Sequence, residues 1–134
     1  MRYLAIRNLV HPKNLNPHGT AFGGFIMAEM DKAASIMVRE VMKGKAVTVF
    51  VDNLHFSHPV RSGDIVSVYA EVRKIGRTSI TLHISFETRC VISREEYSVC
   101  DALFVFVAVD DNNKPTPLRA LLRENIPDYI KAMI

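Results

Sequence analysis

Two stretches in the middle of the chain alternate between apolar and polar residues. The alternation runs through residues 65–74 and, more strictly, through residues 79–87. Because successive side chains of a strand point to opposite faces, this period predicts two strands, each with one buried face. The side chains expected inside are Val66, Val68, Ala70, Val72, Ile80, Leu82, Ile84 and Phe86. Strands of this kind are typical of an antiparallel sheet with one face in water.

Residues 24–42 follow a helical period instead, and Gly44 is expected to close the helix. The apolar side chains form one stripe, made of Ile26, Met30, Ala33, Met37 and Val41 and widened by Met27, Ala34 and Val38. The opposite, charged face is expected to carry Glu29, Lys32, Arg39 and Glu40. Asp31 belongs to neither set. Its neighbours one turn away are small or apolar, so its carboxylate is predicted on the shoulder of the buried stripe.

Other apolar runs predict three more strands, at residues 3–10, 46–56 and 97–109. The last run is apolar on both sides from Ala102 onward, which predicts a central strand beside the helix or a subunit contact. Residues 118–134 are predicted to be helical with a break at Pro127, which leaves a short C-terminal helix. Together these elements predict one α+β domain over residues 1–134, in which an antiparallel sheet wraps one long central helix.

The composition excludes several classes of protein. Of the 134 residues 49% are apolar, which excludes a disordered chain. No apolar run approaches the roughly 18 residues of a membrane span, and residues 1–10 are too short and too charged for a signal peptide. We therefore expect a cytoplasmic protein that does not bind membranes. In that compartment Cys90 and Cys100 are expected to be buried thiols rather than a disulfide.

The charge pattern narrows the choice of partners. The net charge is +3, and the basic residues are scattered apart from small clusters in residues 73–77 and 119–123. Nucleic-acid binding would need a basic stripe, often interleaved with aromatic residues, so no nucleic-acid partner is expected. A phosphorylated small molecule such as coenzyme A suits the local clusters. Solvated loop charge remains the default interpretation of each single cation.

The stretch from Asn16 to Asp31 combines the features of a reactive site. A loop passes through Gly23 and Gly24 and becomes the helix, so a ligand can approach the backbone closely there. The first amides of a helix have no intrahelical partner and carry partial positive charge, which suits a phosphate or a developing oxyanion. Asp31 follows about two turns later. Its alternative interpretation is a boundary residue that only hydrogen-bonds nearby.

These residues carry a resemblance. The run from Asn16-Pro-His-Gly19 to Gly23-Gly24, followed by Met30-Asp31, resembles the loop-and-helix signature of acyl-CoA thioesterases with the hotdog fold. The match is closest to the bacterial YciA-like branch, which is related to cytosolic acyl-CoA hydrolases. It extends over residues 3–118 and includes His55-Phe56, Pro59-Val60, Gly63-Asp64 and the segment 75–80.

The resemblance implies a hotdog fold and hydrolysis of fatty acyl-CoA to free coenzyme A and a carboxylic acid, without a metal or another cofactor. It also implies a homodimer whose sheets join edge to edge and whose active sites are shared, often built into a hexamer as a trimer of dimers. The turn Gly76-Arg77-Thr78-Ser79 resembles the family segment that contacts coenzyme A, although a hairpin turn with a solvated Arg77 also explains it. The remaining positions expected to bind the substrate are Phe22, His58 and Pro59.

Thioester hydrolysis needs a positioned water and a stabilised oxyanion. We assign the first task to Asp31, as general base or as nucleophile, and the second to the amides around Gly23 and Gly24. Asn16 is expected to orient the water or the thioester. Asp31 lies about 10 Å along the helix from Gly24. One carbonyl cannot contact both on a single helix, so they are predicted to come from different protomers.

The histidines leave alternatives open. The five histidines show no metal-ligand spacing. His18 is a candidate second base, but a loop histidine is more often structural, and satisfied polar groups at a turn are the favoured interpretation of His55 and His58. Ser35, one turn from Asp31, is a candidate hydrogen-bond partner for it, and helix packing explains this residue about as well.

Two rival functions lie outside hydrolysis. A hotdog hydratase or dehydratase acting on acyl thioesters would pair the helix carboxylate with a catalytic histidine, for which His18 is the candidate. A non-catalytic acyl-CoA-binding module is the second rival. Regulators of that kind normally carry a DNA-binding segment, for which 134 residues are expected to leave no room.

Overall fold

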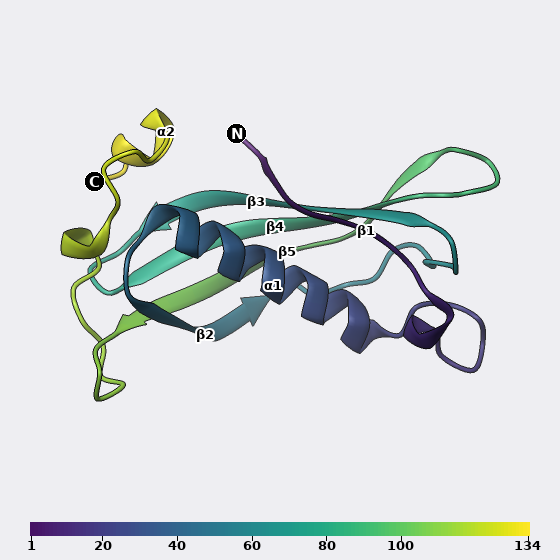
Figure 1. Cartoon of the computed structure of the whole chain (residues 1–134), viewed down its shortest axis with the longest axis horizontal. Coiled ribbons are helices and arrows are strands. Elements are labelled where there is room, and N and C mark those ends of the chain that lie inside the picture. Colours follow the sequence, from purple (N-terminus) through teal and green to yellow (C-terminus); the bar gives the residue numbers. More distant parts are fainter.

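The computed structural model describes all 134 residues (Figure 1). Its main elements are one antiparallel sheet and one long helix. The five strands lie in the order β1-β3-β4-β5-β2, so β1 and β2 are the two edges. In chain order the elements are β1 (Tyr3–Leu9), α1 (Gly23–Val41), β2 (Lys45–Asp52), β3 (Ile65–Ile75), β4 (Ser79–Arg89), β5 (Glu96–Val109) and α2 (Asp128–Lys131). No helix is long and apolar enough to cross a membrane.

Helix α1 lies across one face of the sheet, and the core fills the space between them (Figure 1). All eight side chains predicted inside β3 and β4 are 0% exposed, so the predicted burial of both strands is confirmed. They pack against the buried residues of α1, from Phe25 to Val41. Strand β5 completes the floor with Ala102, Phe104, Phe106 and Ala108. Its central place beside β4 confirms one of the two explanations offered for its apolar sequence.

The prediction for the helix was wrong at two positions. Glu29, expected on the charged face, is only 3% exposed, and Met27, expected in the core, is 41% exposed. Met27 lies on the flank of α1 that faces β2, whereas Glu29 lies on the flank that faces β1. The buried arc of the helix is therefore rotated toward β1, and the flank toward β2 stays open.

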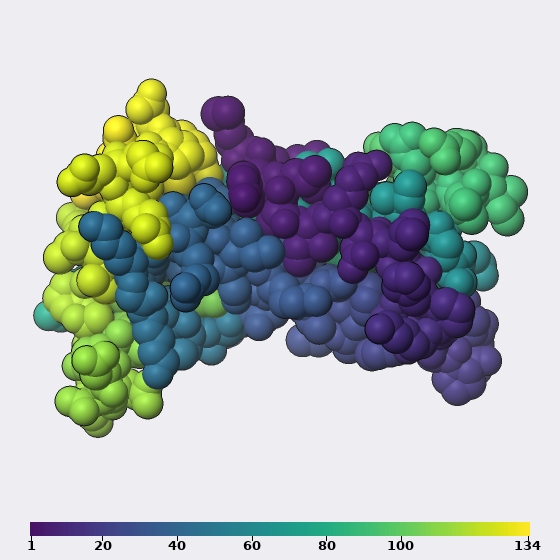
Figure 2. Space-filling view, viewed as in Figure 1, coloured from purple at the N-terminus to yellow at the C-terminus, as the bar shows by residue number.

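The C-terminal segment contains less helix than its sequence predicts. Only a 3-10 turn at Arg119–Leu121 and the four-residue α2 are helical. The backbone between them bonds to the end of α1 instead: the N–H of Lys43 donates to Leu121 O, and the N–H of Arg123 donates to Val41 O. Buried Leu118, Ile126 and Ile130 anchor the segment. Figure 2 shows the C-terminal segment, in yellow, packed beside the end of α1.

Three smaller predictions can also be compared with the structure. Strand β2 ends at Asp52, four residues earlier than predicted, because Asn53 turns the chain with a φ of 60°. Cys90 and Cys100 are both free thiols, as expected, but only Cys100 is fully buried. Gly44, with a φ of 85°, turns the chain between α1 and β2, as predicted.

Candidate active site

The loop before α1 is organised by the side chain of Asn16. Its Oδ1 accepts hydrogen bonds from the backbone N–H of His18 at 2.9 Å and of Thr20 at 3.2 Å. Its Nδ2 donates to Thr20 Oγ1 at 3.1 Å. An amide nitrogen carries two hydrogens, so one N–H of Asn16 is left for another acceptor. The exposed ring of His18 makes no hydrogen bond, and only its backbone is held.

The start of α1 leaves its first amides unpaired. Neither Gly23 N–H nor Gly24 N–H donates to a backbone acceptor, and no side chain caps the helix. A Cβ on Gly23 would lie 2.9 Å from Phe56 Cε2, and one on Gly24 would lie 3.3 Å from Phe22 Cδ2. The two glycines therefore allow aromatic rings to approach the backbone at a helix end that presents free donors.

Asp31 is half-buried on the flank of α1 that faces strand β2. Thr48 Oγ1 of β2 donates a hydrogen bond to Asp31 Oδ1 at 2.8 Å. Ser35, which the sequence suggested as a partner, makes no such bond. Sequence analysis missed Thr48. The available signal was a hydroxyl within an otherwise apolar strand, Val47 to Val51.

A crevice of about 240 Å³ opens beside the start of α1. Gly23 and Ile26 line it on the helix side, and Phe56, His58 and Pro59 line it on the other. The ring of His58 stacks on Tyr97, with the centroids 3.8 Å apart. Its Nδ1 is buried and has no hydrogen-bond partner. This nitrogen lies unpaired in the crevice wall, and the choice between a turn residue and a substrate contact for His58 stays a prediction.

The predicted coenzyme A residues fall into two groups. Phe22, His58 and Pro59 lie at the start of α1, whereas the turn from Gly76 to Ser79 joins β3 to β4 at the opposite end of the protomer (Figure 1). That turn is closed by a hydrogen bond from Gly76 N–H to Ser79 O at 2.8 Å. Arg77 O accepts from the N–H of Leu118, in the segment that packs on the end of α1. The 19-residue helix separates the two groups by about 28 Å.

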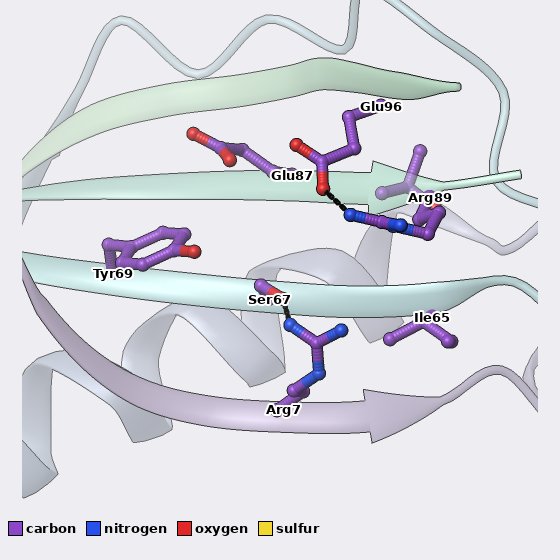
Figure 3. Close-up of a pocket in the computed structure, with 8 residues that line it drawn as sticks. Arg7, Ile65, Ser67, Tyr69, Glu87, Arg89 and Glu96 are labelled. Atoms are coloured by element: carbon purple, nitrogen blue, oxygen red, sulfur yellow. Dashed lines mark hydrogen bonds and ion pairs between the residues drawn. The ribbon is translucent and has the colours of Figure 1, made fainter. Parts of the chain in front are cut away.

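The face of the sheet turned away from α1 carries a small polar depression (Figure 3). Its arginines have partners within the protein: Arg89 pairs with Glu96, and Arg7 donates to Ser67 Oγ at 3.2 Å. None of the predicted site residues lines it. This depression is therefore separate from the candidate active site on the helix side.

Comparison with known proteins identifies the family. A family model described as the thioesterase superfamily matches residues 18–89. An uncharacterized acyl-CoA thioester hydrolase of Haemophilus influenzae is 38% identical over 97% of this chain and 84% of its own length. The acyl-CoA thioester hydrolase YciA of Salmonella typhimurium is 40% identical, with 86% of this chain and 89% of the relative covered.

A solved structure shows the same fold. It is an aspartate-to-alanine variant of a hexameric, broad-specificity acyl-coenzyme A thioesterase, which is 37% identical and superposes with a TM-score of 0.85. The likeness covers 97% of this chain and 94% of that chain. The chain therefore belongs to the thioesterase superfamily, among the YciA-like acyl-CoA thioester hydrolases that share the hotdog fold.

Proposed function

We propose that this protein hydrolyses the thioester of fatty acyl-CoAs to free coenzyme A and a carboxylic acid. The observation that carries the proposal is that one helix presents both a half-buried carboxylate, Asp31, which accepts a hydrogen bond from Thr48, and unpaired amides at Gly23 and Gly24. A base and an oxyanion site are the two groups that acyl transfer to water requires. The names of the relatives at about 40% identity support the same reaction and substrate class.

The two groups act together only across a dimer. Asp31 and Gly24 are about 10 Å apart along one helix, too far for a single carbonyl. The edge strand β2 lies beside Asp31 and exposes Val49 (54%) and Phe50 (56%), which supports an edge-to-edge dimer through this strand. Asp31 of one protomer would then meet the helix start of the other. We extend the assembly to a hexamer, a trimer of such dimers, because structural relatives are described as hexameric.

In the proposed reaction Asp31 takes a proton from a water whose oxygen attacks the thioester carbon. The N–H groups of Gly23 and Gly24 stabilise the negative charge that develops on the carbonyl oxygen. When the intermediate collapses, the C–S bond breaks and the coenzyme A thiolate recovers the proton held by Asp31. The free N–H of Asn16 is placed on the same loop to orient the water or the carbonyl.

A covalent route is the other form of the proposal. In it the carboxylate of Asp31 attacks the thioester carbon, the thiolate leaves, and water hydrolyses the resulting anhydride. Neither route calls for a metal or a further cofactor. The cytoplasmic location remains a prediction from the sequence.

The test is release of free thiol from acyl-CoAs of graded chain length, from acetyl to palmitoyl, by native protein and by Asp31→Asn. The matched control is Glu29→Gln, the same carboxylate-to-amide change two residues away on the other flank of α1. We expect Asp31→Asn to lower kcat by at least about 100-fold, while Glu29→Gln retains the native rate in its folded fraction.

Three outcomes would contradict the proposal. Equal activity of native protein and Asp31→Asn would remove Asp31 from the chemistry. Formation of a hydroxyacyl product from an enoyl thioester would identify a hydratase. Binding of acyl-CoA without any turnover would identify a binding module.

A further inference from the structure

A second pocket opens at the other end of α1, between the last turns of the helix and the start of β2. It has a volume of about 240 Å³. Its apolar lining comes from Val38 of α1, from Met42 directly after the helix, and from Ala46 and Phe106 of the sheet. Ser35, Arg39 and Lys45 add polar groups. Sequence analysis did not identify this pocket.

The pocket continues the flank of the helix on which Asp31 lies. With 100° per residue, Ser35 and Val38 point within about 40° of the direction of Asp31. Arg39 lies about 12 Å further along the axis than Asp31. A substrate whose thioester lies at Asp31 can therefore extend along this flank into the pocket, because a fatty acyl-CoA has long flexible arms.

The pocket carries two positive charges without a counter-ion. None of the six ion pairs in the protein involves Arg39 or Lys45. The guanidinium of Arg39 makes no hydrogen bond, and Lys45 Nζ donates only to the neutral Asn113 Oδ1, at 2.5 Å. Arginines in the depression of Figure 3 have partners of their own. The charge beside the second pocket is thus available to a ligand.

A neighbouring segment reinforces the positive character of this end of the molecule. Arg123 Nε donates to the backbone oxygen of Arg39, so a third guanidinium lies against the last turn of α1. The contact uses only the backbone of Arg39, and a change of its side chain leaves that contact in place. Cations near a helix C-terminus are favoured by the helix dipole. The dipole accounts for the position of these cations, whereas the apolar lining of the pocket is a separate feature.

We propose that this pocket binds an anionic group at the far end of the substrate, with Arg39 and Lys45 as its charge-recognising residues. The inference rests on the proposed function and adds a substrate determinant to it. A phosphate of coenzyme A and a carboxylate at the distal end of a dicarboxylic acyl chain share the required chemistry: each is an anion carried by an arm with apolar parts. Both accept charge-assisted hydrogen bonds from Arg and Lys.

The test compares native protein, the double variant Arg39→Gln/Lys45→Gln and the control Lys43→Gln on three substrates. Hexanoyl-CoA carries the phosphates, hexanoyl-pantetheine lacks them, and adipoyl-CoA adds a distal carboxylate. Lys43 has the same charge and lies two residues from Lys45, but it does not line the pocket. A change in KM with unchanged kcat reports binding that is equal in the ground state and the transition state.

We expect the double variant to raise KM for hexanoyl-CoA roughly tenfold or more, the effect of losing charge-assisted hydrogen bonds. KM for hexanoyl-pantetheine should not change, and Lys43→Gln should behave like the native protein. This result assigns the pocket to the coenzyme A phosphates. If KM rises for adipoyl-CoA and stays constant for hexanoyl-CoA, the pocket recognises a carboxylate on the acyl chain.

Three results would overturn the proposal. They are an unchanged KM for both CoA substrates, an equal rise for hexanoyl-pantetheine, and an equal effect of Lys43→Gln. Absence of turnover by the native protein is a different failure, since it would contradict the proposed function. Calorimetric titration of coenzyme A and of pantetheine into the same variants would then still decide whether Arg39 and Lys45 bind the phosphates.

Discussion

The two flanks of α1 present carboxylates only two residues apart in opposite situations. Glu29, on the flank facing β1, is 3% exposed; it accepts from Asn8 Nδ2 at 3.4 Å and lies 2.9 Å from Lys32 Nζ. Asp31, on the flank facing β2, is half-buried and has a single hydrogen bond, from Thr48. The first carboxylate is enclosed by its own protomer. The second keeps acceptor capacity for a substrate or a water.

The difference comes from the edge strands rather than from the helix. Residues two apart on a helix point about 200° away from each other, so each faces a different edge of the sheet. On the β1 side the side chain of Asn8 reaches over to the helix, and the carboxylate of Glu29 is buried there. On the β2 side Val49 and Phe50 are exposed, and no further strand of the chain covers this edge. The edge strand beside each acidic residue therefore decides whether its carboxylate is enclosed or open to a ligand.

The largest effect is expected from placing a charged side chain on one edge strand at a time. Phe50→Lys places a cation on the exposed edge of β2, where we expect it to prevent the proposed dimer from forming. Thiol release should then fall by at least about 100-fold, because the two halves of the proposed site lie on separate molecules. Leu9→Lys is the matched control on β1, since Leu9 is 50% exposed and Phe50 is 56% exposed. Light scattering after size exclusion measures the assembly. Dissociation by Leu9→Lys, with an intact dimer in Phe50→Lys, would reverse the assignment of the edges.

Glu29→Gln tests the enclosed flank. The change removes the ion pair with Lys32 and leaves a buried polar group with poorer partners, so we expect the free energy of unfolding to fall by about 1–3 kcal/mol. Urea denaturation measures this loss. Asp31→Asn, on the open flank, should stay within about 0.5 kcal/mol of the native protein because its environment is partly solvated. A larger loss of stability from Asp31→Asn than from Glu29→Gln would show that the flanks do not differ as described.

The smallest expected effect concerns the hydrogen bond that orients Asp31. Thr48→Val keeps the shape of the side chain and removes the hydroxyl that donates to Asp31 Oδ1. We expect kcat to fall roughly tenfold, the equivalent of about 1.4 kcal/mol, with little change in KM. Thr48→Ser retains the hydroxyl and should recover most of the rate. If Thr48→Val is as active as the native protein, Asp31 does not need this bond for its proposed task.

Much of the fold could be predicted because its signals are local. The alternation in β3 and β4 identifies the buried side chains without knowledge of any neighbour. The C-terminal segment shows where this fails. Its residues favour helix locally, yet its backbone pairs with the end of α1, through bonds from Lys43 N–H to Leu121 O and from Arg123 N–H to Val41 O. A contact between segments about 80 residues apart produces no hydrophobic periodicity in either segment.

The candidate site divides in the same way. The glycines at the start of the helix and the unusual position of Asp31 are visible in the sequence, because a helix start and a helix face are local properties. Thr48 and Lys45 are not, since their roles depend on the pairing that places β2 beside α1. The unpaired Nδ1 of His58 likewise results from the way its ring is enclosed against Tyr97.

By itself the sequence determined the helix, the strands, the buried face of each central strand and the loop that carries the unpaired amides. Only the tertiary structure decided that Glu29 is buried, that Asp31 meets Thr48, and that Arg39 and Lys45 share a pocket. The physical reason is that a helical period states the angle between side chains but not which side the sheet covers. The order of the strands places β1 on one flank of α1 and the open edge of β2 on the other, and so separates an enclosed carboxylate from one that is open to a ligand.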